Sequence, residues 1–311
     1  MDADGDYRNF HCGTVAIVGR PNVGKSTLLN RILDEKVAIV SPVPQTTRNP
    51  VRGIYNDERG QIIFIDTPGL HFGRDQLDRF MNHSAYGACA DVDCLIYLVD
   101  ANHPVGKEEE RIAERLGSLA KPIILGLNKV DVGDRYIPDY ISVWERVTGK
   151  PVQESDLLTL LPLSPHDNIH IEKLINILLE KLPPAPPFYP RDAICDIPQR
   201  MAIADIIREK LFLVMRQEIP HSIAVVIEEM QRTSKTTWHI RALILVEKES
   251  HKLIVIGKQG QVLKNAGIQA RAELEQLLES KVFLDMHVKY KKNWRDDFSL
   301  LEEMGYIKEE G

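Results

Sequence analysis

Eight residues near the start of the chain restrict its fold more than any other stretch. Residues 19–26, with the sequence GRPNVGKS, match the phosphate-binding pattern GxxxxGK[ST] at every fixed position. The glycines let backbone N–H groups turn toward phosphate oxygens, Lys25 is expected to reach the β- and γ-phosphates, and Ser26 is expected to ligate Mg²⁺. An apolar β-branched run over 14–18 precedes the loop, and a helical pattern over 26–33 follows it. The pattern therefore predicts a nucleotide-binding loop made of Gly19, Arg20, Pro21, Asn22, Val23, Gly24, Lys25 and Ser26.

The chain after this loop alternates between strand and helix patterns. Strands are predicted over 51–55, 61–65, 94–99, 122–127 and 157–163, and helices over 108–119 and 171–182. Such alternation is typical of a parallel sheet, because parallel strands need helical crossover connections. The sequence thus predicts an α/β domain with a mostly parallel sheet and helices on both faces.

Two further motifs follow strands of this predicted sheet. Asp66-Thr67-Pro68-Gly69 comes after the strand over 61–65, at the end where a parallel sheet places ligand-binding groups. Asp66 is expected to hold Mg²⁺ through water, and the Gly69 N–H to contact a γ-phosphate. Asn128-Lys129-Val130-Asp131 comes after the strand over 122–127. Asp131 would accept hydrogen bonds from N1–H and the N2 amine of guanine, whereas adenine has an acceptor at N1, so this motif predicts selectivity for guanine.

Together, GRPNVGKS, QTTR, DTPGLH and NKVD resemble the motifs of the Era GTPases, a family of P-loop GTPases. The resemblance implies GTP hydrolysis with Lys25, Thr47 and Gly69 as catalytic residues, and it makes Thr47 the second Mg²⁺ ligand, beside Ser26, when GTP is bound. It also implies a monovalent cation beside Asn22. The further GTP-binding residues that it implies are Asp66, Thr67, Pro68, Gly69, Leu70, Asn128, Lys129, Val130, Asp131 and Ser164.

Two positions depart from wider GTPase patterns. Leu70 stands where many GTPases carry a water-orienting glutamine, and Era-like proteins resemble this chain in having an apolar residue there. Hydrolysis is therefore expected to be slow and to depend on a group other than this side chain. Pro165 stands where the family has an alanine whose N–H contacts the guanine carbonyl. Proline has no N–H, so one contact to the base is expected to be missing.

The second half of the chain begins after a proline-rich stretch. Residues 182–190 contain five prolines in nine positions, which predicts an extended, semi-rigid spacer. Beyond it, a helix is predicted over 201–214, strands over 222–227, 237–246, 253–256 and 282–288, and a helix from residue 262. The loop Gly257-Lys258-Gln259-Gly260 precedes that last helix. A GxxG loop allows close approach to a nucleic-acid strand, although an ordinary glycine turn is the alternative.

This order of elements resembles a KH type 2 domain, and the second half is basic. Residues 191–295 carry 18 basic and 13 acidic side chains, a net charge of +5. The resemblance implies RNA binding by the loop and by nearby cations, namely Ile256, Gly257, Lys258, Gln259, Gly260, Lys264, Arg271, Lys289, Lys291 and Lys292. Tyr290 and Trp294 lie among the last of these cations, where aromatic side chains suit base stacking, and a place in the core is the alternative for Trp294. The predicted organisation is an N-terminal tail (1–12), a GTPase domain (13–182), a linker (183–190), a KH type 2 domain (191–293) and a C-terminal tail (294–311).

The resemblance to Era GTPases further implies partners and a location. It implies binding of 16S ribosomal RNA near its 3′ end, assistance to assembly of the small (30S) ribosomal subunit, a monomeric chain, and a cytoplasmic protein with peripheral contact at the inner face of the membrane. The sequence itself has no apolar run of 18 residues and no lipidation motif. Its four cysteines, Cys12, Cys89, Cys94 and Cys195, form no metal-binding spacing and are expected to be reduced thiols.

Two other classes of function remain open at this point. A P-loop kinase of small metabolites would share the first motif but would have no use for NKVD. A GTPase that binds proteins or membranes, with a second domain inert toward RNA, would share the whole first half. Comparing the binding of ATP and GTP would distinguish a kinase from a GTPase. RNA crosslinking in cells would distinguish an RNA-binding GTPase from one whose second domain is inert toward RNA.

Overall fold

A computed structural model describes residues 7–215 and 222–306 of the chain. The described residues form two compact units. The first comprises the residues up to Ala38 together with Thr47–Arg74 and Met81–Asp196, and the second comprises Ile39–Thr46, Asp75–Phe80 and the residues from Ile197 onward. Residues 1–6 and 307–311 of the predicted tails, and 216–221 of the predicted KH domain, lie outside the described residues.

The first unit is built on a seven-stranded sheet with the order β6-β5-β4-β1-β3-β2-β7. Its parallel strands are β1 (His11–Val18), β3 (Gly60–Asp66), β4 (Cys94–Asp100), β5 (Ile123–Asn128) and β6 (Leu158–Leu163). At one side β2 (Val51–Asn56) runs antiparallel to β3, and the short β7 (Cys195–Asp196) runs antiparallel to β2. The central strands are apolar on both faces, as parallel strands covered by helices must be.

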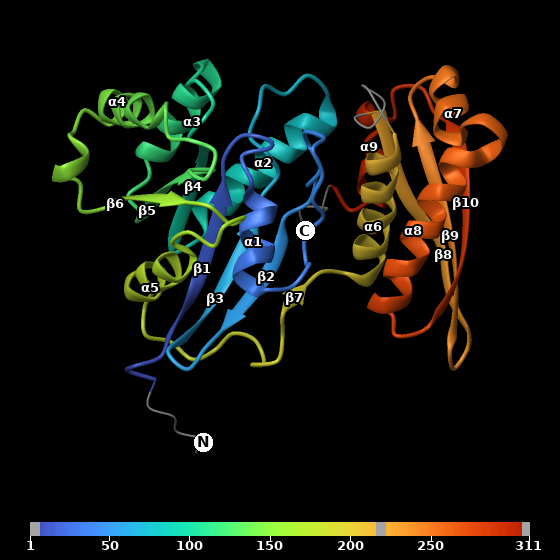
Figure 1. The fold of residues 1–311 in the computed structure, drawn as a ribbon, viewed down its shortest axis with the longest axis horizontal. Coiled ribbons are helices and arrows are strands. Elements are labelled where there is room, and N and C mark those ends of the chain that lie inside the picture. Colours follow the sequence, from blue (N-terminus) through green and yellow to red (C-terminus); the bar gives the residue numbers. More distant parts are fainter. Residues whose placement is uncertain (1–6, 216–221, 307–311) are drawn as a thin grey trace. The chain divides into compact units, whose positions relative to one another are not determined.

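Helices cover both faces of this sheet (Figure 1). One face carries α1 (Lys25–Leu33) and α5 (Ile171–Lys181). The other carries α2 (Gln76–Ala90), α3 (Lys107–Gly117) and α4 (Ile137–Thr148), which pack with the strands in one hydrophobic core. This confirms the predicted α/β fold, and it brings the loops after β1, β3, β5 and β6 to the same edge of the sheet.

The proline-rich segment is fixed to the first unit. Cys12 N–H donates to the Pro183 carbonyl (3.1 Å), and the amide oxygen of the buried Gln61 accepts from Phe188 N–H (2.7 Å) and Tyr189 N–H (2.9 Å). The segment forms no helix, as predicted. It is not a free spacer, however, because the Pro183 carbonyl and the N–H groups of Phe188 and Tyr189 pair with the body of this unit.

The second unit contains a three-stranded sheet with helices on one face (Figure 1). Its elements are α6 (Gln199–Val214), β8 (Ile223–Ser234), β9 (Thr237–Val246), α7 (Glu249–Ile256), α8 (Gln261–Leu277) and β10 (Lys281–Tyr290). Strands β8 and β9 are antiparallel, and β10 is a parallel strand at the edge beside β9. Helices α6 and α8 pack on the sheet through buried aliphatic side chains. The predicted KH arrangement is confirmed.

One predicted strand is wrong. Residues 253–256 belong to helix α7, which begins at Glu249 and ends where Gly257 adopts a φ of +75°. In this helix Val255 is buried, whereas the Leu253 side chain is 73% exposed. A run of four apolar residues is compatible both with a short strand and with part of a helix, so the hydrophobic pattern alone does not decide between them.

The residues predicted as a C-terminal tail are partly folded. Trp294 is completely buried, and its indole N–H donates to the Ser222 carbonyl (2.9 Å). After it, a short helix, α9 (Phe298–Glu303), buries Leu300 and Leu301. Trp294 therefore belongs to the core of the second unit and is not an exposed platform for stacking RNA bases.

Candidate functional site

The phosphate-binding loop lies between β1 and α1, as the sequence predicted. The Lys25 ammonium is buried and donates to the carbonyls of Gly19 (3.1 Å) and Arg20 (2.9 Å). Burial lowers the pKa of Lys25 to about 8, although the nearby Asp66 carboxylate opposes the shift. A lysine held inside its own loop is placed to meet phosphate oxygens that enter the loop.

Three oxygen-bearing side chains meet beside Lys25. The Ser26 hydroxyl donates to Asp66 Oδ2 (2.6 Å) and lies 2.9 Å from the Thr47 hydroxyl, which itself lies 3.5 Å from Asp66 Oδ2. Asp66 is fully buried, and among the residues that the structure describes its Oδ1 has no hydrogen-bond partner. Burial raises the pKa of Asp66 to about 6, against the opposing effect of Lys25. A buried carboxylate with an unpaired oxygen and two hydroxyls is a donor set that fits Mg²⁺ with water between metal and carboxylate.

The loop after β3 is joined to the phosphate-binding loop. A Cβ atom on Gly69 would lie 2.7 Å from the backbone nitrogen of Pro21, so only glycine permits this approach. The N–H of Leu70 donates to the Gly19 carbonyl (3.0 Å), and the Thr67 hydroxyl donates to the Ile17 carbonyl (2.8 Å). The Leu70 side chain is 1% exposed and lies in the hydrophobic core. Only the backbone of Leu70 is therefore placed to contact the phosphate-binding loop.

Asn128 and Lys129 tie the end of β5 to the same loop. The Asn128 amide nitrogen donates to the Val23 carbonyl (2.7 Å). The Lys129 ammonium donates to the Asn22 carbonyl (3.0 Å) and to Asp100 (2.7 Å). These bonds hold the end of β5 against the phosphate-binding loop.

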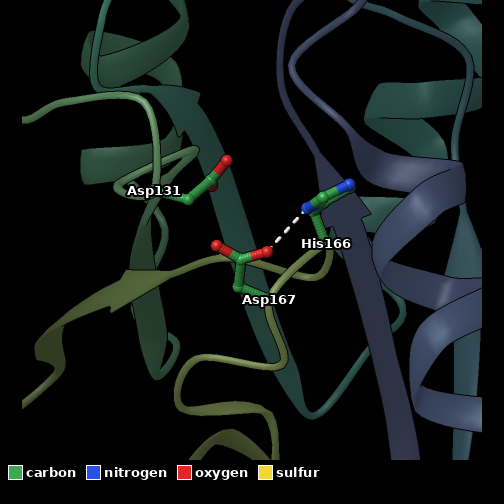
Figure 2. A group of neighbouring side chains, drawn as sticks. All are labelled: Asp131, His166 and Asp167. Carbon is green, nitrogen blue, oxygen red and sulfur yellow. Dashed lines mark hydrogen bonds and ion pairs between the residues drawn. The ribbon is translucent and has the colours of Figure 1, made fainter.

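Asp131 remains exposed beside two residues of the loop after β6 (Figure 2). Ligand atoms of Asp131, His166 and Asp167 all lie within 4.8 Å of one another, and His166 Nδ1–H donates to Asp167 (2.6 Å). The buried Ser164 hydroxyl accepts from the Asp167 N–H (3.2 Å), and Pro165 is buried next to it. The carboxylate that would read guanine is therefore accessible, with an imidazole close by.

The predicted RNA-binding loop is exposed on the second unit. Gly257 has a φ of +75°, and an added Cβ would lie 2.4 Å from the Val262 side chain, so this turn requires glycine. Lys258 and Gln259 are exposed at its tip, and Gly260 is the N-cap residue just before α8. The backbone of the loop is thus accessible, with a cation beside it.

A groove of about 510 Å³ continues from this loop between α8 and the edge strand β10. It is lined by Gly260, Leu263, Lys264, Gly267, Ile268, Arg271, Leu284, Asp285 and Met286. The predicted cations Lys264 and Arg271 are both exposed along it. An apolar floor flanked by cations and an edge strand suits an extended single strand of nucleic acid.

Three other predicted RNA-binding lysines lie apart from the residues that line this groove. Lys289 is exposed on β10 and Lys292 is exposed just after it. The Lys291 ammonium forms an ion pair with Asp297 (2.6 Å). The structure therefore brings together the loop with Lys264 and Arg271, and leaves the three lysines beyond the groove lining.

The sequence interpretation missed two acidic residues that organise the nucleotide site. Asp100 ends β4 and holds Lys129, and Glu108 in α3 lies 3.0 Å from the Arg20 guanidinium. The signal for Asp100 was present, because it is an aspartate at the carboxyl end of a predicted parallel strand, like Asp66. Nothing in the spacing of Glu108 points to Arg20, since that contact depends on how α3 packs.

Comparisons with known proteins agree with this geometry. The family model described as "50S ribosome-binding GTPase" matches residues 14–129, and the one described as "KH domain" matches residues 218–295. The chain is 42% identical over 299 residues to the GTPase Era of Halothermothrix orenii, covering 96% of this chain and 99% of that protein. It is also 42% identical over 301 residues to the GTPase Era of Carboxydothermus hydrogenoformans, covering 96% and 98%.

Solved structures give the same result. One is Era in complex with MgGDPNP and nucleotides 1506–1542 of 16S ribosomal RNA, with a TM-score of 0.88 and 36% identity, covering 96% of this chain and all of that one. Another is a variant of Era from Aquifex aeolicus bound to GDP and AlF₄⁻, with a TM-score of 0.87, 36% identity and the same coverage. Both parts of the fold therefore occur together in known proteins.

Proposed function

The chain belongs to the Era family of GTPases, and we propose that it is a GTP-controlled factor that binds 16S ribosomal RNA through its KH domain and assists assembly of the small ribosomal subunit. GTP hydrolysis is the activity of this family. The RNA partner is inferred from the similar Era structure that contains nucleotides 1506–1542 of 16S ribosomal RNA. The observation that best supports the proposal is the exposed GxxG loop that opens into a groove lined by Lys264 and Arg271.

In the nucleotide site, each proposed role follows from a contact. Lys25 would exchange its bonds to Gly19 and Arg20 for bonds to phosphate oxygens. Ser26 and Thr47 would ligate Mg²⁺, and Asp66 would hold one of its waters. The bound ion would neutralise part of the charge on the phosphates.

Two parts of the site then act on the two ends of the nucleotide. The backbone at Gly69, close against Pro21, would meet the γ-phosphate. Asp131 would accept from guanine N1–H and N2, and Asn128, Lys129 and Ser164 would help to position the base through the loops that they hold. Since Pro165 has no N–H, the guanine carbonyl would receive one contact fewer than in the family pattern.

In the KH unit, the loop from Gly257 to Gly260 would clamp phosphates of a single strand, with Lys258 adding attraction. Lys264 and Arg271 would continue this contact along the groove. The apolar side chains on the floor, Leu263 and Ile268 among them, would face the bases. Lys289 and Lys292 would add only long-range attraction, because they lie outside the groove lining.

One pair of measurements tests this function against its rivals. Calorimetry should give a much lower dissociation constant for GDP than for ADP, whereas similar values would favour a P-loop kinase. Filter binding should show retention of a single-stranded RNA with the sequence of the last part of 16S ribosomal RNA. Tight GDP binding without any RNA retention at low salt would favour a GTPase whose second domain is inert toward RNA.

The remaining inferences from family resemblance stay proposals. They are a monovalent cation beside Asn22, a monomeric chain in the cytoplasm, and peripheral contact with the inner face of the membrane. Within residues 7–215 and 222–306, no helix combines the length and apolar character needed to cross a bilayer. A flotation assay with anionic vesicles and sedimentation in solution would test membrane contact and oligomeric state.

A further inference from the structure

The first turn of α3 joins two loops of the nucleotide site through one side chain. Glu108 Oε2 lies 3.0 Å from the Arg20 guanidinium in the phosphate-binding loop. Its other oxygen, Oε1, accepts a 3.1 Å hydrogen bond from the N–H of Phe72, in the segment that follows Gly69. The Glu108 side chain is 24% exposed, so solvent only partly screens these contacts.

Other contacts hold the same segment from both sides. The Arg111 guanidinium, about one helical turn after Glu108 on α3, lies 4.5 Å from the centre of the Phe72 ring. His71 N–H donates to Asn82 Oδ1 (3.3 Å), and the Asn82 amide donates back to the His71 carbonyl (2.7 Å). With the bond from Leu70 to Gly19, residues 70, 71 and 72 each have a backbone contact that fixes them.

The turn that carries Glu108 is itself anchored in the core. Its neighbour Glu109 is 1% exposed and is hydrogen-bonded to the Tyr97 hydroxyl on β4. Burial raises the pKa of both groups and so favours their neutral, protonated forms inside the domain. Glu108 is therefore presented from a rigid position, which a side chain on a mobile loop would not have.

We propose that Glu108 is a positioning residue for GTP hydrolysis, which fixes the backbone of residues 69–72 relative to the phosphate-binding loop. The inference rests on the GTPase function proposed above. Leu70 has its side chain in the core and cannot orient the attacking water, so alignment at the γ-phosphate falls to the backbone at Gly69. Glu108 sets where that backbone lies without touching the nucleotide.

An exposed ion pair that contributes nothing measurable is the alternative explanation for the contact between Glu108 and Arg20. That explanation leaves the bond to the Phe72 N–H without consequence. The two explanations differ in what happens to the rate of hydrolysis when Glu108 is replaced and the protein remains folded.

The test compares the full-length protein with Glu108→Ala, Glu108→Gln and a matched control, Glu110→Gln. Glu110 is in the same first turn of α3 and pairs with Arg146 (2.6 Å) on an exposed surface, so the control removes the same charge from the same helix end. Glu108→Ala should lower kcat for GTP about tenfold or more and leave KM within about twofold, because misplacement of reacting groups costs mainly rate. Glu110→Gln should match the parent.

The kcat of Glu108→Gln should fall between those of Glu108→Ala and Glu110→Gln. Its amide oxygen can still accept from Phe72 N–H, whereas its ion pair with Arg20 is lost. Amide hydrogen exchange measured by NMR should be faster at Phe72 in Glu108→Ala and unchanged in Glu110→Gln. A parent-like kcat for Glu108→Ala, with the fold intact by circular dichroism, would overturn the inference. Absence of hydrolysis by the parent protein would instead refute the proposed function.

Discussion

The Ser26 hydroxyl donates a 2.6 Å hydrogen bond to Asp66 Oδ2 and so joins the first turn of α1 to the end of β3. These residues come from two separate motifs, and the parallel pairing of β1 with β3 brings them together. Asp66 is completely buried, and it lies close enough to Lys25 for their charges to affect each other. A buried acid and a buried base this close to each other have consequences for stability as well as for binding.

The first prediction concerns pH. The pKa of Asp66 is raised to about 6 in the folded protein, whereas an unfolded aspartate titrates near 4. Between these values the folded protein binds more protons than the unfolded chain, so the free energy of unfolding should fall as pH rises from about 4 to about 6. We expect this site to contribute on the order of 1–3 kcal/mol to that fall.

Urea unfolding of the nucleotide-free protein in EDTA, at several pH values in this window, measures the effect. The control is Asp66→Asn, which cannot ionise and should show a smaller fall over the same range. Identical pH dependence in both proteins would mean that folding leaves the pKa of Asp66 unchanged, contrary to the prediction.

The second prediction concerns the base. Asp131→Asn should weaken GDP binding and admit xanthine nucleotides, because the asparagine amide can donate to the oxygen that xanthine carries at position 2. Asp131 is exposed, so the variant should keep the stability of the parent. Calorimetry with GDP, ADP and xanthosine diphosphate measures the preference, and an unchanged order of affinities would argue against Asp131 as the base-reading group.

The third prediction concerns Leu70, which stands where many GTPases carry a water-orienting glutamine. The Leu70 side chain is 1% exposed and lies in the hydrophobic core. Leu70→Ala should therefore lower the free energy of unfolding by about 2–5 kcal/mol, through the cavity that it leaves. Chemical denaturation measures this, and Leu157→Ala, at a leucine that is 43% exposed, is the control expected to change stability little.

The sequence predicted those parts of the fold that depend on local pattern. The strand that ends at Asp66 is a buried run rich in β-branched residues, and the phosphate-binding loop over 19–26 has glycines at fixed positions. Both patterns are local, so the sequence alone predicted where these elements lie. The helix α7 was missed because four apolar residues fit either a strand or a helix. Its true ending is set by Gly257, which had been interpreted only as part of the RNA-binding loop.

What the sequence could not provide are contacts between distant residues that share no motif. Glu108 meets Arg20 and Phe72 only because α3 packs beside the loops at the edge of the sheet. Trp294 was open to two interpretations, and its bond to the Ser222 carbonyl decided for the core. In each case the residue type was compatible with several surroundings, and tertiary packing selected one.

The last prediction tests the RNA-binding loop. Replacing Lys258 and Gln259 together by aspartate puts two anions at the exposed tip of the turn between Gly257 and Gly260. Phosphate contacts supply much of the affinity for nucleic acid, so RNA binding should weaken about tenfold or more, which corresponds to about 1.4 kcal/mol per factor of ten. GDP binding should survive, because the changed residues belong to the second unit and the residues proposed to bind the nucleotide belong to the first.

A matched variant separates a local effect from a change in net charge. Lys235→Asp combined with Thr236→Asp makes the same charge change in the exposed turn between β8 and β9 of the same unit, at residues that do not line the groove. Filter binding of single-stranded ribosomal RNA at one fixed salt concentration should show a loss for the first variant and a smaller loss for the second. Equal retention by the parent and the Lys258 and Gln259 variant would mean that the GxxG turn is only structural, since two anions cannot lie against an RNA backbone without cost.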